Sequence, residues 1–66
     1  MINGERIKAL MKEQGVTSKE LADVAGVSEA MICYILRGQR DTTVRVMSQI
    51  AKRLGVTVDE LLKREG

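Results

Sequence analysis

The sequence predicts an all-α fold, with five short helices in one domain that covers residues 1–66. Apolar residues recur at spacings of three and four, as in Ile7, Leu10 and Met11. Glycines follow such segments, and Asn, Ser or Thr residues precede them, which is the pattern of helix ends and helix starts. The chain contains no Pro, Phe or Trp, so we expect aliphatic residues, methionines and alanines to form the core.

The first predicted helix begins at Asn3, its expected N-cap, and ends at Gln14, where Gly15 follows. Its charged side chains mix both signs and lie mainly off the apolar stripe. This helix is therefore interpreted as scaffold with a solvated outer face.

The second and third predicted helices lie between Thr17 and Gly38 and are joined by a tight turn. Thr17 and Glu20 form the pattern of a capping box, in which each side chain accepts a hydrogen bond from the other residue's backbone amide. Gly26 ends the first of these helices, and Ser28 is placed to cap the second. Two short helices joined in this way form a helix-turn-helix, whose second helix can lie in the major groove of DNA.

The fourth predicted helix begins after Thr42 or Thr43, and Gly55 stops it. Thr57 and Glu60 form a second capping box at the start of a short fifth helix. The apolar residues of the fourth helix that are expected to close the core are Val44, Met47, Ile50, Ala51 and Leu54.

The composition argues against several classes of function. A single Cys cannot form an internal disulfide, and no apolar run approaches the roughly 20 residues that span a membrane. The N-terminus lacks a signal-peptide pattern, so a cytoplasmic location is expected. With no His and no cluster of carboxylates, the chain lacks a recognisable metal site or nucleophile–base pair, and neither catalysis nor a cofactor is predicted. The net charge of +2 is only mildly basic, so the distribution of charge must carry any argument for nucleic acid.

The second and third predicted helices also carry a resemblance to a known family. The residues that carry it are Glu20-Leu-Ala, Ala25-Gly-Val-Ser28, Ile32, Ile35 and Arg37-Gly38. They are similar to the Cro/C1-type helix-turn-helix family, also called the XRE family, of phage repressors and bacterial regulators. The flanking helices resemble that family too, so the likeness spans nearly the whole chain. It implies a compact five-helix, lambda-repressor-like domain that binds double-stranded DNA as a homodimer and represses transcription by occluding a promoter.

The resemblance assigns DNA contacts to individual positions. Ile32 and Ile35 face inward, so the opposite side of their helix is expected to face a groove, with Met31 near its edge. The residues on that side are Glu29, Ala30, Cys33, Tyr34 and Arg37. The candidate base-reading residues are Ser28, Glu29, Ala30, Met31 and Tyr34. The candidate phosphate contacts are Ser18, Lys19, Arg37, Arg40 and Thr43. We expect Glu29 to accept a hydrogen bond from a cytosine amino group, and Ala30 and Met31 to touch thymine methyl groups.

The proposed groove-facing helix departs from the family pattern, because residues 30–36 are apolar nearly all round. Met31 and Tyr34 fit either packing at the edge of the core or contact with DNA. Leu36 stands where family members often carry Glu, and we interpret it as part of the core. Cys33 is interpreted as a small space-filling residue rather than a reactive thiol.

The last helix carries a candidate dimer interface. Leu61 and Leu62 are adjacent, so one helix face cannot bury both equally well. One is expected to pack inside, while the other forms an exposed patch with Val58 and Val46 that marks a homodimer interface. In the alternative, both leucines belong to the core. The resemblance favours the dimer, because its two motif helices would enter grooves roughly 34 Å apart.

Two functions from different classes fit these observations. The first is a dimeric transcriptional repressor that binds double-stranded DNA. The second is a protein-interaction module on the same scaffold, such as an antitoxin or anti-repressor subunit, which the apolar motif helix supports. No membrane partner and no small-molecule ligand is expected in either case.

Overall fold

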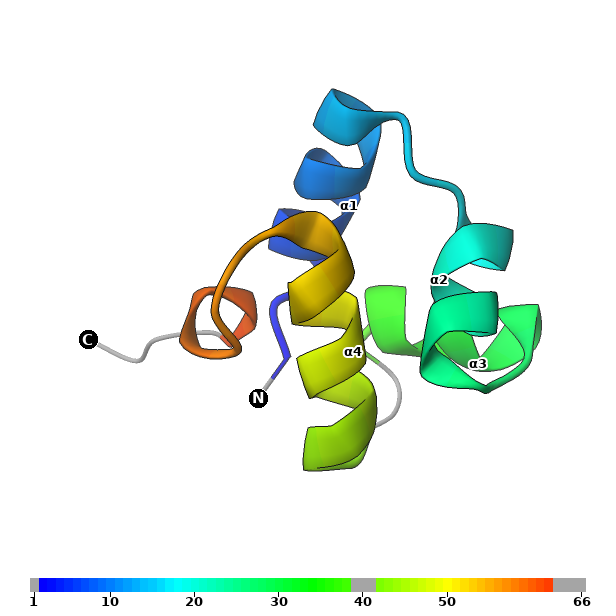
Figure 1. Ribbon diagram of the computed structural model, residues 1–66. Coiled ribbons are helices and arrows are strands. Elements are labelled where there is room, and N and C mark those ends of the chain that lie inside the picture. Colours follow the sequence, from blue (N-terminus) through cyan, green and yellow to red (C-terminus); the bar gives the residue numbers. More distant parts are fainter. Residues whose placement is uncertain (1, 39–41, 63–66) are drawn as a thin grey trace.

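The computed structural model describes residues 2–38 and 42–62, which form a bundle of helices (Figure 1). The elements are α1 (Gly4–Gln14), α2 (Ser18–Ala25), α3 (Glu29–Leu36), α4 (Val44–Leu54) and the 3₁₀ helix η1 (Asp59–Leu61). In the view of Figure 1, α2 and α3 lie to one side of α4, and η1 lies to the other. The one strand-like pairing in the described residues is an isolated antiparallel bridge between Ile2 and Leu62. The all-α prediction is confirmed for this part of the chain.

The prediction of five α-helices is wrong, because the fifth segment forms a single 3₁₀ turn. Its capping box is present: the amides of Thr57 and Glu60 each donate to the other residue's side chain at 3.3 Å. The backbone then makes i to i+3 bonds, such as that from the Leu61 amide to the Val58 carbonyl at 2.9 Å. Leu62 is already extended (φ −100°, ψ 144°) and pairs with Ile2. Too few residues remain between the cap and this bridge for a regular α-helix.

The N-caps of the four α-helices are where the sequence predicts them. Each cap side chain accepts a hydrogen bond from the amide three residues later, at 3.1 to 3.2 Å; the caps are Asn3, Thr17, Ser28 and Thr43. Thr43, and not Thr42, therefore caps α4. Each cap satisfies one amide that has no partner inside its helix, which is typically worth about 1 kcal/mol.

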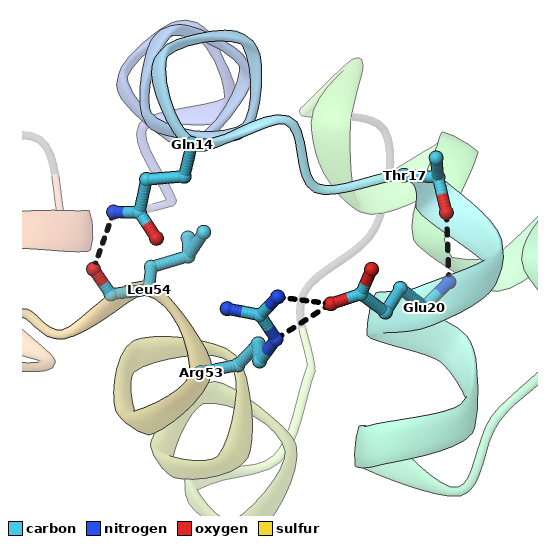
Figure 2. A network of polar contacts seen from close by, with 5 residues as sticks. All are labelled: Gln14, Thr17, Glu20, Arg53 and Leu54. Atoms are coloured by element: carbon cyan, nitrogen blue, oxygen red, sulfur yellow. Dashed lines mark hydrogen bonds and ion pairs between the residues drawn. The ribbon is translucent and has the colours of Figure 1, made fainter.

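The predicted box between Thr17 and Glu20 is only half formed, because the Glu20 carboxylate is directed to Arg53 (Figure 2). Glu20 Oε2 accepts a hydrogen bond from Arg53 Nε at 2.6 Å and pairs with Nη2 of the same guanidinium. The carboxylate therefore takes a charged partner from α4 in place of the local amide. The contact joins the first turn of α2 to the last turn of α4.

A second polar contact joins the C-terminal ends of α1 and α4. Gln14 Nε2 donates to the Leu54 carbonyl at 2.7 Å (Figure 2). This bond satisfies one of the carbonyls that the end of α4 leaves without a partner. Together with the Glu20–Arg53 pair, it fixes the last turn of α4 against two other helices.

The core is purely apolar, as the composition predicts. In the described residues no polar or charged side chain is buried. The buried apolar residues are Ile2, Ile7, Leu10, Met11, Val16, Leu21, Ala22, Ala25, Ile32, Ile35, Val46, Met47, Ile50, Ala51, Leu54 and Leu61.

Two valines of α4 have exchanged their predicted positions. Val44, expected in the core, is 78% exposed, whereas Val46, expected in an exposed patch, is 5% exposed. At 100° per residue, Val44 lies about 90° from the centre of the buried stripe of α4, and Val46 lies about 70° from it on the other side. Helical periodicity therefore barely distinguishes them. Val44 is also the first residue of α4, at the open end of the helix. Both predictions are therefore wrong, and Val46 belongs to the core.

The first residue of α1 is a glycine in close contact with the backbone of α3. A Cβ atom at Gly4 would lie 2.0 Å from the Leu36 carbonyl oxygen and 2.7 Å from the carbonyl carbon. Backbone atoms cannot rotate away as the end of a side chain can. The two helices therefore meet main chain to main chain at this point.

We expect Arg53→Met to lower the free energy of unfolding by about 0.5 to 1 kcal/mol. The value is small because the side chains of Arg53 and Glu20 are 36% and 41% exposed, so water screens the pair. Urea unfolding of both proteins measures the difference, which should shrink in 1 M salt. Lys52→Met, which removes the neighbouring exposed cation, is the matched control. Equal effects of the two substitutions would show that the ion pair adds nothing.

Candidate nucleic-acid interface

The turn between α2 and α3 determines where α3 begins. Gly26 adopts the left-handed conformation (φ 71°), which a residue without a Cβ reaches at little cost. The Val27 amide then donates to the Ala22 carbonyl at 3.0 Å, and Ser28 caps α3. Ala22 and Ala25 are buried, as a close crossing of the two helices requires.

The helix α3 has one buried side and one exposed side. Ile32 and Ile35 have no exposed surface, which confirms that they are its inward anchors. Glu29, Ala30 and Cys33 are exposed, and Tyr34 is 44% exposed. We call the residues Glu29, Ala30, Cys33 and Tyr34 the outer face of α3. The buried isoleucines fix the orientation of this face, since a helix cannot rotate about its axis without exposing them.

The other predicted base-reading residues differ in how far they reach solvent. Ser28 is exposed immediately before the outer face, although its hydroxyl is engaged by the Met31 amide at 3.2 Å. Met31 is half-buried and packs against the core. Of its two predicted roles, packing is therefore observed, and contact with DNA stays a prediction. Leu36 also packs against the core, as interpreted.

Cys33 is exposed, so its interpretation as a space-filling residue is wrong. It lies three residues after Ala30 and four after Glu29, which places it on the same side of the helix. The exposed position confirms that Cys33 is turned to the outer side of α3, as the inward anchors Ile32 and Ile35 predict.

The predicted phosphate contacts lie at helix ends. Ser18 and Lys19 form the first turn of α2, Arg37 ends α3, and Thr43 precedes α4. Lys19, Arg37 and Thr43 are exposed, and Ser18 is half-buried. Amides in a first helical turn lack helical partners and point toward an approaching anion, so such ends bind phosphate readily. The fifth candidate, Arg40, lies outside the described residues.

Positive charge flanks α3 but is absent from the outer face. Glu29 is the only charged residue within α3. Lys19 precedes the helix in sequence, whereas Arg37 and Arg45 follow it, and all three are exposed. In sequence, the exposed cations therefore lie before and after α3, and the outer face itself carries no positive charge.

The predicted dimer patch is smaller than the sequence suggests. Leu61 has no exposed surface, so one of the two adjacent leucines packs inside, as expected. Val46 is buried as well, which removes it from any surface patch. Val58 and Leu62 are half-buried and pack against the core with the rest of their surface accessible. A role of this surface in dimerisation stays a prediction.

Residues 2–38 and 42–62 contain neither a cluster of possible metal ligands nor a helix that could span a membrane. No group of three or more His, Cys, Asp or Glu side chains there could hold a metal ion. No helix in the same ranges is both long and apolar enough to cross a bilayer.

Helices α2 and α3 are joined by Gly26, Val27 and Ser28 and pack with α1 and α4. This arrangement defines a helix-turn-helix domain. A family profile described as helix-turn-helix matches residues 7–61. The chain belongs to this family, in its Cro/C1-type branch, as the sequence resemblance predicted.

Similar proteins are named as regulators. The immunity repressor protein of Bacillus phage phi105 is 31% identical over 65 residues, which are 98% of this chain and 45% of the repressor. A solved structure of SinR, described as the master regulator for biofilm formation in complex with DNA, matches with a TM-score of 0.78. It is 33% identical, and the match covers 89% of this chain and 98% of that one. SinR from Bacillus subtilis is also among the regulators with a similar sequence.

A second SinR structure is described as a complex of SinR with the protein SinI. It matches with a TM-score of 0.82 at 34% identity, covering 97% of this chain and 62% of that one. The present chain spans less than half of the length of the phi105 repressor, and a similar share of other curated regulators.

Proposed function

We propose that this chain is a transcriptional regulator that binds double-stranded DNA in a sequence-specific manner and acts as a repressor. The observation that carries the proposal is the outer face of α3, which is exposed, fixed in orientation and flanked in sequence by exposed cations. The names of similar proteins support it, since they include an immunity repressor and a regulator in complex with DNA. We place this activity in the cytoplasm, where the DNA of a bacterium lies.

Sequence reading is assigned to the outer face of α3 and the residues beside it. Ser28, Glu29 and Ala30 would reach base edges with the first turn of the helix, and Tyr34 would do so one turn later. Glu29 cannot bind phosphate, so its contribution must come from a base, with the cytosine amino group as the best donor. Met31 would touch a thymine methyl group with the part of its side chain that the core leaves accessible.

Positioning on the duplex is assigned to phosphate contacts. Lys19 and Arg37 supply charge, while Ser18 and Thr43 present hydroxyl groups at the starts of α2 and α4. Arg40 completes the proposed set. Such contacts orient the protein on any sequence and make binding dependent on salt.

Selection from a randomised duplex library, at near-physiological salt and with excess competitor DNA, tests the proposal directly. We expect enrichment of an inverted repeat whose half-sites lie about one helical turn, roughly 34 Å, apart. If folded protein enriches no motif, the proposed function is wrong.

That negative result would favour a second function, in which the outer face of α3 binds another protein. Ala30, Cys33 and Tyr34 make this exposed face largely apolar, which is the observation that supports it. A similar chain occurs in a complex described as SinR with SinI. In that case, a soluble partner protein rather than DNA should protect Cys33 from alkylation.

We expect Arg37→Ala to weaken binding to every duplex alike and to reduce the slope of log affinity against log salt by about 0.9, the value for one phosphate contact. Lys52→Ala is the matched control, because it removes the same charge from an exposed position in the last turn of α4. This position is about 12 Å along α4 from its start, so it should leave the slope nearly unchanged. Glu29→Ala should behave differently: the base preference at one position should relax by about 1 to 3 kcal/mol. Binding to random DNA should strengthen, because a like charge is removed. Equal effects of the Arg37 and Glu29 substitutions on the selected and random duplexes would contradict this division of roles.

Dimerisation is assigned to Val58 and Leu62, the accessible part of the predicted patch, while Leu61 between them in sequence is buried in the core. A two-fold dimer would present two copies of α3 to successive turns of the duplex. The partner is therefore a second copy of the same chain.

We expect Leu62→Glu to convert a dimer of twice 7.3 kDa into a monomer, because the patch would carry like charges on both sides of its axis. Sedimentation equilibrium measures the mass, and circular dichroism shows whether the helices remain. Val44→Glu is the control, since Val44 is the most exposed large apolar residue described and lies outside the proposed patch. A monomer produced by Val44→Glu but not by Leu62→Glu would move the interface to the start of α4.

A further inference from the structure

We infer, on the basis of the DNA-binding function proposed above, that Gly4 is a positioning residue for DNA contact. It determines where the C-terminal end of α3 lies against α1. It touches no proposed DNA contact itself and acts through the backbone of Leu36.

The requirement for glycine at this position is steric. The described glycines with positive φ are Gly15, Gly26, Gly38 and Gly55, and a Cβ at any of them would meet open space. Gly4 is the reverse case: its φ is not positive, but a Cβ would lie 2.0 Å from the Leu36 carbonyl oxygen. The close approach of the two backbones therefore leaves no room for a side chain at this position.

The Leu36 carbonyl is suited to this contact because it belongs to the last residue of α3. Carbonyls in the last turn of a helix have no amide partner within the helix. The space beside this oxygen admits a hydrogen atom of Gly4 but no Cβ, as at close helix contacts where a Cα–H group approaches a carbonyl. The contact therefore adds a main-chain constraint to the end of α3, beside the buried Ile35 and the packing of Leu36 on the core.

The start of α1 is itself held from the other side. The Asn3 amide donates to the Leu61 carbonyl at 2.8 Å, and Ile2 pairs with Leu62. Ile2 is also buried, at 6% exposed. Residues 2–4 are thus fixed between η1 and α3, and α1 cannot easily withdraw from an added methyl group.

An added Cβ would therefore displace the end of α3. An ordinary contact between a Cβ and an oxygen begins at 3.4 Å, whereas a Cβ at Gly4 would lie 2.0 Å from the Leu36 oxygen. The oxygen would therefore have to move away by roughly 1.4 Å. A hydrogen bond to a base tolerates a change of only a few tenths of an ångström in the distance between donor and acceptor. A shift of this size at the end of α3 would therefore break such bonds. Tyr34 and Arg37, next to Leu36, would be misplaced most. Glu29, at the other end of α3, is held by the turn at Gly26 and would move least.

The test compares Gly4→Ala with the wild type on the selected duplex and on a random duplex. Loss of stability alone reduces the folded fraction and weakens apparent affinity for both duplexes by the same factor. The ratio of the two affinities is therefore insensitive to a merely structural role. We expect Gly4→Ala to lower this ratio about tenfold, the equivalent of one lost base contact.

Ala51→Gly is the control for lost stability, because glycine costs about 1 kcal/mol inside α4, a helix that packs mainly on α2. It should leave the ratio within about twofold of the wild type. Trimethylamine N-oxide in all samples favours the folded state of each variant. Amide chemical shifts should change mainly over residues 34–38 in Gly4→Ala and around residue 51 in the control.

The outcomes separate the two claims. If the wild type shows no preference for any duplex, the proposed function fails and the role of Gly4 fails with it. If the wild type discriminates and Gly4→Ala discriminates equally well, the role of Gly4 alone is wrong. A Gly4→Ala chain that stays unfolded even with the osmolyte also overturns the inference. In that case α3 has no second, shifted position, and Gly4 is needed for folding rather than for positioning.

Discussion

The burial of Ile32 and Ile35 is the interaction on which the rest of the structure depends. Both side chains have no exposed surface, and burial of each stabilises the fold by about 1.5 to 3 kcal/mol. In a chain of 66 residues, total stability is only about 3 to 10 kcal/mol, so these two residues account for a large share. Because α3 has only 8 residues, two anchors three positions apart fix its rotation completely. The outer face of α3, and with it the proposed reading of DNA, follows from this one packing arrangement.

Polar contacts hold the ends of the helices and take no part in the core. No polar side chain is buried in residues 2–38 and 42–62, so nothing inside the bundle requires a hydrogen-bond partner. The caps, the Glu20–Arg53 pair and the Gln14–Leu54 bond all lie at helix ends. An aliphatic core excludes water but allows neighbouring helices to slide, whereas these directional contacts oppose sliding. The ends of α1, α2 and α4 are consequently set relative to one another.

Most of the candidate site was predictable because it depends on local spacing. The inward position of Ile32 and Ile35, the cap at Ser28 and the turn at Gly26 all involve residues within a few positions of one another. The same rule placed Cys33 on the outer face, where it is exposed, and only its interpretation as a space-filling residue was wrong. Val44 and Val46 were assigned wrongly for a different reason. They flank one stripe at similar angles, and only the neighbouring helices decide which of them is covered.

The sequence by itself determined the helices, their caps and the side of α3 that is buried, because interactions three and four residues apart are written in one stretch of chain. Only the tertiary structure decided the contacts between distant stretches. The Glu20 carboxylate leaves its local amide for Arg53, 33 positions later, because a guanidinium happens to be carried there by α4. The last segment stops at one 3₁₀ turn because Leu62 is drawn into a bridge with Ile2. Gly4 meets Leu36 for the same reason: the distance between two backbones depends on how the helices pack, and periodicity carries no information about it.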